Sequence, residues 1–275
     1  MTEIDVRAFE QYEVAGWEHV AAVYERVWSP ITSQAVVPLL DAAGVESGLR
    51  VVDVGSGAGD AAARATQRGA QATGVDVSAA MVEIATRRHP ATTFVEASVT
   101  ELPFSDESFD AAVGNIIIQH VGEAERAARE LARVLVPRGR VALSTWEAPE
   151  RSPFFGALLG AIADAQVPPP SEVPPGPSFF QFADEAAFQN LLRSAGFAQV
   201  SVVTISVEFP LDSADDLITA LADGTVRTGA LLRAADDRQR RAMGESLDDR
   251  LEEWRRGDRY VVPAPVKIAS ARKVD

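Results

Sequence analysis

The segment VVDVGSGAGD, at residues 51–60, constrains the fold of this chain more than any other stretch. An apolar run passes there directly into a turn that contains Gly55, Gly57 and Gly59, and an Ala-rich stretch follows. Glycine permits a tight turn and lets a ligand approach the backbone closely. The pattern predicts a buried strand, a ligand-binding turn and a helix that begins at the turn.

The same alternation of strands and helices continues on both sides of residue 150. Ser78 precedes one of these helices as its expected N-cap. Alternation of this kind predicts an α/β fold with a parallel sheet covered by helices on both faces. We expect strands at 50–54, 70–76, 92–96, 109–115, 140–145, 199–209 and 260–271, and helices at 59–68, 78–89, 123–136, 154–165, 184–195 and within 212–257.

Helices are also expected before the first strand, at residues 6–28 and 31–43. Trp17, Tyr24 and Trp28 recur at helical spacing on one face of the first. That face either packs the helix on the domain or contributes to a substrate pocket. Six prolines between positions 168 and 177 predict a stiff, exposed connector. The charges of 233–259, with opposite signs four residues apart, predict a solvated helix face.

Acidic residues beside the glycine turn indicate the kind of cofactor. Dinucleotide dehydrogenases have G-x-G-x-x-G, in which a pyrophosphate rests on the helix N-terminus. Here Asp60 takes the place of the last glycine, and Asp53 stands two residues before the first. Negative charge there repels a pyrophosphate and suits a cofactor with an ammonium group. Asp76 ends the second strand, near the spacing at which an acid receives ribose hydroxyls.

Composition narrows the classes of partner. The chain has 26 Lys and Arg against 40 Asp and Glu, a net charge of −14, which opposes nucleic-acid binding and docking on an anionic membrane. Cysteine is absent, so disulfides and thiolate sites are excluded. No acidic or histidine cluster has metal-site spacing. We expect a cytoplasmic protein with a small-molecule substrate, because the N-terminus lacks an apolar signal region and no apolar stretch is long enough to span a membrane. The sequence predicts no oligomeric state.

Four stretches carry a resemblance to a known family: VVDVGSGAG, GVDVSAAMVEIA, TELPFSDESFDAAVGN and ELARVLVPRGRVALSTW, which together cover residues 50–146. In them the chain resembles the class I S-adenosylmethionine-dependent methyltransferases, in the branch similar to UbiE-type small-molecule enzymes. The resemblance implies a Rossmann-like, seven-stranded, mostly parallel sheet with an antiparallel last strand and a helical substrate cap. It implies an N-terminal cap at 1–44 and a cofactor-binding methyltransferase domain at 45–275, with a lid insertion at about 149–181.

The resemblance also implies roles for individual residues. Asp76 would hold the ribose hydroxyls. Met81 would flank the adenine together with Val77, although a methionine at this place also serves as core filler. Ser98 departs from the aspartate that is common in relatives, and a hydroxyl is a weaker acceptor for the adenine amine. Around the rest of the cofactor, Asp53, Gly55, Ser56, Gly57 and Gly59 would line the methionine end, Val99 would face the adenine edge and Asn115 would lie beside the sulfonium.

The predicted function is transfer of a methyl group from S-adenosylmethionine, with S-adenosylhomocysteine as product. Trp17, Tyr24 and Trp146 belong to an aromatic group of residues in the expected cap, which favours a small apolar or aromatic acceptor such as a secondary metabolite or a quinone-like compound. Oxygen, carbon and nitrogen acceptors stay open. His120 is the first candidate for a base and His19 the second; His120 is otherwise a structural hydrogen-bonding residue. Two alternatives are a protein of the same fold that binds the cofactor without methylating, and a dinucleotide oxidoreductase.

Overall fold

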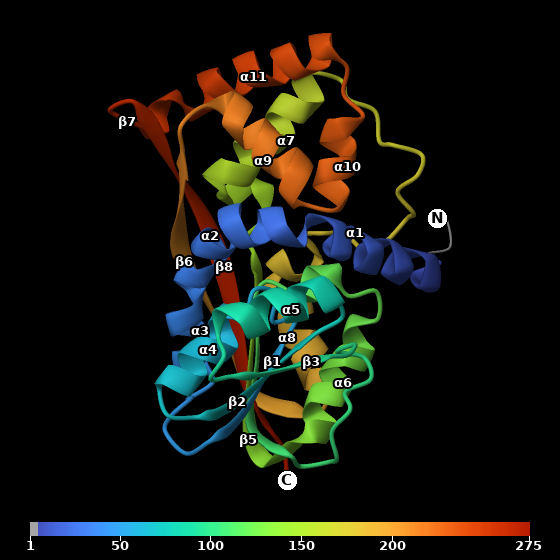
Figure 1. Ribbon diagram of the computed structural model, residues 1–275, viewed down its shortest axis with the longest axis vertical. Helices are drawn as coiled ribbons and strands as arrows, with labels where there is room; N and C mark the ends of the chain where they lie inside the picture. The colour runs from blue at the N-terminus through green and yellow to red at the C-terminus, as the bar shows by residue number, and fades with distance from the viewer. Residues whose placement is uncertain (1–4) are drawn as a thin grey trace.

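The computed structural model describes residues 5–275 and contains one mixed sheet with helices on both faces (Figure 1). Seven strands lie in the order β3-β2-β1-β4-β5-β8-β6, and the short β7 pairs with β8 as an eighth. Strands β1 to β5 pair in parallel, whereas β8 is antiparallel to both of its long neighbours, as predicted. The strands are β1 (Arg50–Val54), β2 (Gln71–Asp76), β3 (Thr93–Glu96), β4 (Phe109–Gly114), β5 (Leu135–Trp146), β6 (Phe197–Leu211), β7 (Arg255–Arg256) and β8 (Arg259–Lys273).

The helices of the α/β layers also form where the sequence pattern predicts them. Ser78 caps α5 as expected, since its side chain accepts a hydrogen bond from the backbone N–H of Met81. The helices are α1 (Val6–Val27), α2 (Ser29–Thr32), α3 (Val36–Ala42), α4 (Asp60–Gln67), α5 (Ala79–Arg88), α6 (Ala124–Val134), α7 (Pro153–Asp164), α8 (Glu185–Ser194), α9 (Ala214–Gly224), α10 (Arg227–Arg233) and α11 (Asp237–Leu251).

The structure differs from the predicted elements at one helix and at the start of one strand. The single helix expected at 31–43 is divided into α2, a 3₁₀ turn and α3. Pro38 explains part of this division, because proline has no backbone N–H and fits best in the first turn of a helix, where it lies in α3. Strand β5 begins at Leu135 instead of residue 140, since Leu135 already pairs with Phe109 of β4 before an irregularity in the register.

The alternation of apolar residues along β1 explains why helices cover both faces of the sheet. Val51 packs in one hydrophobic cluster with Leu39 and Leu40 of α3 and with the alanines of α4. Val52 and Val54 point to the opposite face, where α6 and α8 bury Leu131, Leu191 and Leu192. Successive side chains of a strand face opposite sides, so the three valines of this five-residue strand support both layers.

A second layer of helices lies at one end of the sheet (Figure 1). Strands β6 and β8 are each 15 residues long and extend into this layer, where α9, α10 and α11 connect them. Helix α11 packs on α7, and α9 packs on α1. The solvated face predicted at 233–259 is therefore only one side of α11, whose other side buries Met243, Leu247 and Leu251.

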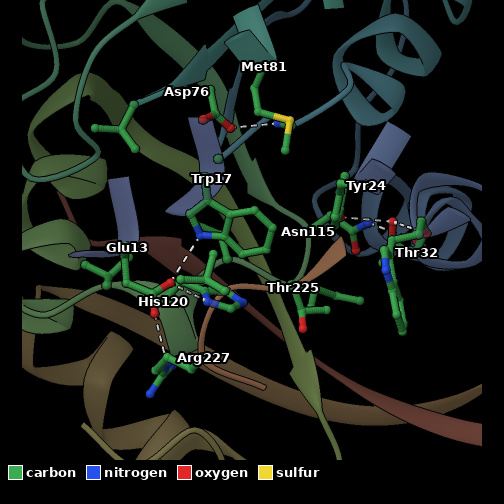
Figure 2. A pocket seen from close by; sticks show the side chains of 18 of the residues that line it. Glu13, Trp17, Tyr24, Thr32, Asp76, Met81, Asn115, His120, Thr225 and Arg227 are labelled. Carbon is green, nitrogen blue, oxygen red and sulfur yellow. Dashed lines mark hydrogen bonds and ion pairs between the residues drawn. The ribbon is translucent and has the colours of Figure 1, made fainter. Parts of the chain in front are cut away.

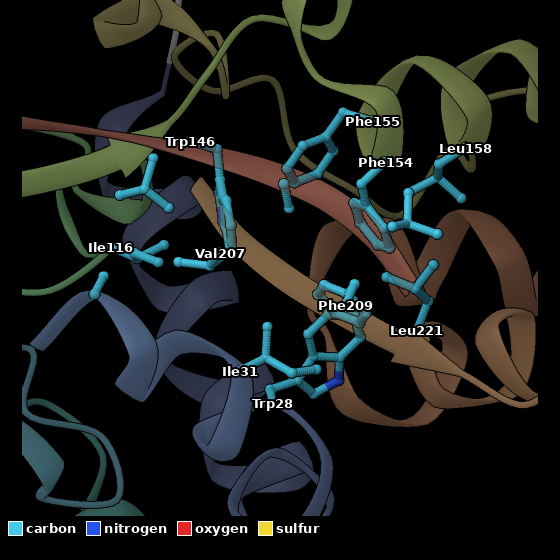
Figure 3. Close-up of a cluster of buried hydrophobic side chains, with 14 of the residues drawn as sticks. Trp28, Ile31, Ile116, Trp146, Phe154, Phe155, Leu158, Val207, Phe209 and Leu221 are labelled. Carbon is cyan, nitrogen blue, oxygen red and sulfur yellow. The ribbon is translucent and has the colours of Figure 1, made fainter. Parts of the chain in front are cut away.

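Aromatic packing joins the segments of this layer (Figure 3). Phe154 of α7 stacks on Phe209 of β6, with ring centroids 4.2 Å apart. Trp28, at the end of α1, lies with its ring 5.0 Å from that of Phe209. Residues far apart in sequence thus share one core. None of the helices formed by residues 5–275 is both long and apolar enough to cross a bilayer.

Candidate active site

A cavity of about 320 Å³ opens where β1, β2 and β4 end, between the sheet and the layer of helices that contains α1 and α9 (Figure 2). The carboxyl ends of parallel strands are the usual ligand-binding edge of such a sheet. The structure brings most of the predicted site residues to this cavity. They are Trp17, Tyr24, Gly55, Gly57, Asp76, Val77, Met81, Ser98, Val99, Asn115, His120 and Trp146.

Four predicted residues do not line the cavity. His19 lies on the exposed side of α1, so the structure does not bring this second candidate base to the site. Ser56 is buried beneath the turn. Gly59 faces the protein interior, because a Cβ there would lie 2.7 Å from Cζ of Phe94. The fourth residue is Asp53, which lies below the turn.

The carboxyl group of Asp53 is directed toward the start of α4. Its Oδ2 accepts a hydrogen bond from the backbone N–H of Ala62 at 2.9 Å, and its Oδ1 has no hydrogen-bond partner among residues 5–275. Burial raises the pKa of Asp53, the Ala62 hydrogen bond lowers it, and the nearby Asp76 and Asp60 raise it; the net result is a pKa of about 8. In this structure Asp53 shapes the turn from below instead of facing the ligand space.

Asp76 and Gly57 form the polar edge of the cavity. Asp76 Oδ2 accepts from the backbone N–H of Gly57 at 2.8 Å, and Oδ1 accepts from that of Ser78 at 3.0 Å. A carboxylate has about four acceptor sites, so both oxygens retain capacity for ligand hydroxyls. Gly57 has φ of +51°, and a Cβ there would meet only Cε1 of Tyr24, at 3.6 Å. The backbone of the turn is therefore open to a ligand beside a buried acid.

The end of β4 is held by a polar network. The amide of Asn115 donates to the backbone carbonyl of Thr32 at 3.0 Å and accepts from Ser144 Oγ at 2.8 Å. The same Ser144 oxygen accepts from the backbone N–H of Ile116. Ile116 has φ of +56°, which is rare and strained for a β-branched residue. No pattern in the sequence indicated this strained position, which lines the cavity.

The wall opposite Asp76 is largely apolar. Phe154, Phe155 and Phe179 come from residues 149–181, and Leu221 and Thr225 come from α9 and the residue that follows it. The contribution of α9 was missed because residues 212–257 carry no motif, and their helical pattern does not indicate what they pack against.

His120 contacts the cavity from the 3₁₀ turn after β4, and Glu13 of α1, which also lines the cavity, lies beside it (Figure 2). His120 Nδ1 is 3.0 Å from Glu13 Oε2. Arg227 Nε is 2.9 Å from Glu13 Oε1, an ion pair without the alignment of a hydrogen bond. Glu13 and Arg227 were not predicted. Glu13 had a detectable signal, a charged residue in register with Trp17, Val20 and Tyr24 on the apolar side of its helix, whereas Arg227 had none.

Comparisons with known proteins agree with this geometry. A family described as methyltransferase domain matches residues 52–143. The demethylmenaquinone methyltransferase of Clavibacter sepedonicus is 30% identical over 190 residues, which cover 64% of this chain and 74% of the relative. This chain belongs to the class I S-adenosylmethionine-dependent methyltransferases.

Solved structures with the same fold include two chains of low sequence identity. The YcgJ protein of Bacillus subtilis has a TM-score of 0.58 at 22% identity, covering 88% of this methyltransferase and 99% of that chain. A phosphoethanolamine N-methyltransferase of Haemonchus contortus, in complex with phosphomonomethylethanolamine and S-adenosylhomocysteine, has a TM-score of 0.58 at 17% identity. The match covers 97% of this methyltransferase and 60% of the Haemonchus contortus chain.

The cavity of this methyltransferase fits S-adenosylmethionine, the cofactor of the family. The backbone at Gly57 is open to a ligand, because a Cβ placed there would have only Tyr24 within 4 Å. Asp76 lies beside Gly57 with free acceptor sites for ribose hydroxyls. Ser98 and Met81 line the same cavity near Asp76. The bound cofactor supplies an electrophilic methyl group on a sulfonium.

Proposed function

We propose that this methyltransferase methylates a hydroxyl group of a small aromatic metabolite and that His120 removes the proton of that hydroxyl. The observation that carries the proposal is the position of His120 in the lining of the cavity, beside a row of aromatic rings. Its ring packs on Phe179, which packs on Phe155, which in turn packs on Trp146. Aromatic walls favour a flat apolar acceptor. Histidine is the side chain whose ordinary proton affinity suits a base near neutral pH.

The roles predicted for the cofactor side belong to the same proposal. Asp76 binds the ribose hydroxyls, and the turn at Gly55 and Gly57 receives the methionine end. Met81 and Val77 lie against the adenine, with Ser98 and Val99 at its edge. Asn115 holds the end of β4 beside the sulfonium. The hydrogen bonds of Asp76 to Gly57 and Ser78 support this arrangement, because they orient the carboxylate at the rim of the cavity.

Residues 5–44 and 149–181 form the proposed substrate cap, and residues 1–4 of the predicted N-terminal cap lie outside the described residues. Trp17 and Tyr24 of α1 and Phe154 and Phe179 of the second segment line the cavity on the side away from the sheet. A closed apolar cap excludes water from the reacting groups and orients the acceptor. A quinone-like acceptor in its reduced form, which carries hydroxyl groups, is the first compound to test. Demethylmenaquinone is named in the relative from Clavibacter sepedonicus.

Turnover decides between this function and cofactor binding without methylation. The protein is incubated with S-adenosylmethionine together with one candidate acceptor at a time: reduced demethylmenaquinone, simple phenols or aromatic amines. The S-adenosylhomocysteine formed in each reaction is quantified by mass spectrometry. We expect product with a hydroxylated aromatic compound. Binding of the cofactor without turnover of any acceptor would support the non-methylating alternative.

His120→Ala tests the base. We expect kcat to fall at least about 10²-fold while affinity for S-adenosylhomocysteine changes less than about threefold. His19→Ala is the matched control, since His19 is exposed on α1 outside the cavity, and it should leave kcat unchanged. If His120→Ala lowers kcat only a few-fold and melts several degrees lower, His120 is a structural hydrogen-bonding residue.

A further inference from the structure

Glu13 is a charged residue in a place where charge is costly. It lies on the apolar side of α1 and is only 4% exposed. Three side chains from three parts of the chain converge on its carboxylate: Trp17 Nε1 donates to Oε2 at 3.1 Å, His120 Nδ1 lies 3.0 Å from the same oxygen, and Arg227 Nε lies 2.9 Å from Oε1. We infer that Glu13 is a positioning residue that fixes the ring and the tautomer of His120, an inference that rests on the proposed function.

The surroundings of Glu13 keep it ionised. Burial alone would raise its pKa, but the hydrogen bond and charge of His120, the charge of Arg227 and the Trp17 bond together lower the pKa of Glu13 below its ordinary value. An ionised carboxylate has no proton to donate and only accepts hydrogen bonds. In the neutral imidazole of His120, Nδ1 must therefore carry the hydrogen.

This tautomer determines what His120 offers to the cavity. Because Nδ1 carries the hydrogen, Nε2 has a free lone pair, and no hydrogen bond joins Nε2 to another residue between 5 and 275. Trp17 and Phe179 pack edge-on to the ring of His120, with centroids 5.0 and 5.6 Å away, and hold its plane. His120 thus presents a hydrogen-bond acceptor of fixed orientation.

Arg227 connects this arrangement to the rest of the cap. Its guanidinium donates to the backbone carbonyls of Gln119 at 2.8 Å and Pro177 at 3.2 Å, and it lies over the rings of Phe9 and Phe179. The ion pair with Glu13 therefore exists only when α1, α10 and the segment around Pro177 are packed together. Packing of the cap therefore places Glu13 beside His120, in addition to covering the substrate.

The acceptor O–H gives its proton to Nε2 of His120 as the acceptor oxygen forms its bond to the methyl carbon, and the methyl–sulfur bond breaks with its electron pair left on sulfur. The imidazolium that results carries hydrogen on both nitrogens and is stabilised by the charge of Glu13. Release of the Nε2 proton to water restores the neutral ring.

The protonation of each ring nitrogen of His120 can be observed by NMR, because the chain has only three histidines and their signals are few. With ¹⁵N-labelled histidine, the spectrum of the whole protein at about pH 9 distinguishes protonated from bare ring nitrogens; His120→Gln assigns the signals. We expect Nδ1–H with a bare Nε2 in the native protein. In Glu13→Gln we expect a mixture of tautomers, because an amide both donates and accepts.

The kinetic arm uses whichever aromatic acceptor the protein turns over. Glu13→Gln should lower kcat at least about tenfold with KM of the acceptor within about threefold, and Arg227→Lys should retain more activity than Arg227→Gln. Glu18→Gln makes the same charge change on an exposed position of α1 and should alter neither spectrum nor kcat.

The outcomes that overturn the inference are separate from those of the proposed function. Hydrogen on Nε2 in the native spectrum overturns it without any acceptor and without any variant, even if Glu13→Gln fails to fold. An unchanged tautomer and an unchanged kcat in Glu13→Gln also overturn it. Absence of turnover in the native protein contradicts the proposed function, whereas the native ring spectrum still decides the role of Glu13.

Discussion

At the scale of single residues, Asp53 makes stability depend on pH. Its pKa is raised from 3.8 to about 8 in the folded chain, mainly by burial. The folded state then binds more protons than the unfolded state between these values, so the free energy of unfolding falls as pH rises from about 4 to about 8. Asp53→Asn removes this titration. We expect the melting temperature of Asp53→Asn, relative to the native protein, to be higher at about pH 8.5 than at about pH 5.

The measured quantity is the difference in melting temperature between variant and native protein at each pH, since the amide itself shifts stability by a constant amount. Differential scanning calorimetry in buffers of equal ionic strength measures it. A difference independent of pH would show that Asp53 is ionised in the folded protein across this range.

Gly57 is the residue whose replacement should affect the cofactor most selectively. Gly57→Ala places a methyl group in the cavity at φ of +51°, with only Tyr24 near it. Gly48→Ala is the matched control, because Gly48 has φ of +87° with nothing within 4 Å of its Cβ, and it does not line the cavity. Both variants should lose about 1–2 kcal/mol of stability from the left-handed backbone. Only Gly57→Ala should weaken S-adenosylhomocysteine binding, by about tenfold in calorimetry.

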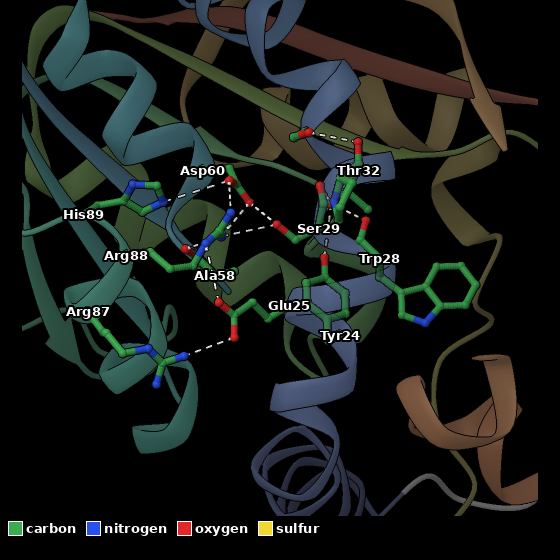
Figure 4. Close-up of polar contacts among 12 residues, drawn as sticks. Tyr24, Glu25, Trp28, Ser29, Thr32, Ala58, Asp60, Arg87, Arg88 and His89 are labelled. Carbon is green, nitrogen blue, oxygen red and sulfur yellow. Dashed lines mark hydrogen bonds and ion pairs between the residues drawn. The ribbon is translucent and has the colours of Figure 1, made fainter. Parts of the chain in front are cut away.

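At the scale of elements, hydrogen bonds and an ion pair of Arg88 connect the N-terminal helices to the glycine turn (Figure 4). Its guanidinium donates to the carbonyl of Ala58 at 2.8 Å and to Asp60 at 3.1 Å, reaches Ser29 at 3.3 Å and pairs with Glu25 at 3.6 Å. Ser29 also contacts Asp60. These contacts join α5, the glycine turn, α1 and α2.

Arg88→Gln should therefore lower the free energy of unfolding by about 1.5–3 kcal/mol, the range for hydrogen bonds to charged groups. It should also increase amide hydrogen exchange in α1. Arg87→Gln is the neighbouring control, since Arg87 is 61% exposed and forms a single ion pair with Glu25; its loss should be under about 1 kcal/mol. Equal losses in the two variants would contradict the role assigned to Arg88.

At the scale of the whole molecule, cofactor binding should stabilise the fold as one unit. The cavity is built from the sheet, α1, the segment 149–181 and α9, so a ligand within it contacts both layers. At about 100-fold excess over Kd, S-adenosylhomocysteine should add about 2.7 kcal/mol, or about 5–10 °C in melting temperature. NAD should add nothing, because Asp60 stands where the dinucleotide-binding motif has its last glycine. A rise with NAD alone would contradict this expectation.

The sequence by itself determined the α/β fold, the cofactor and most of the predicted residues that line the cavity. These depend on local patterns: the apolar runs of β1 and β2, the glycines between β1 and α4, and an acid at the end of β2. Each motif spans only a few residues, and parallel strands necessarily bring their carboxyl ends to one edge. His120 was also identified, because it follows β4 at that edge.

Tertiary structure alone decided which side chains complete the site. Glu13 and His120 are 107 residues apart and Arg227 lies 108 residues beyond Gln119, and no local pattern relates such positions. Their contact depends on how α1, α10 and the segment around Pro177 pack over the sheet. The same reason explains why the contribution of α9 to the cavity wall was not predicted. Packing between distant helices is set by the shapes of their buried faces, which periodicity in the sequence does not specify.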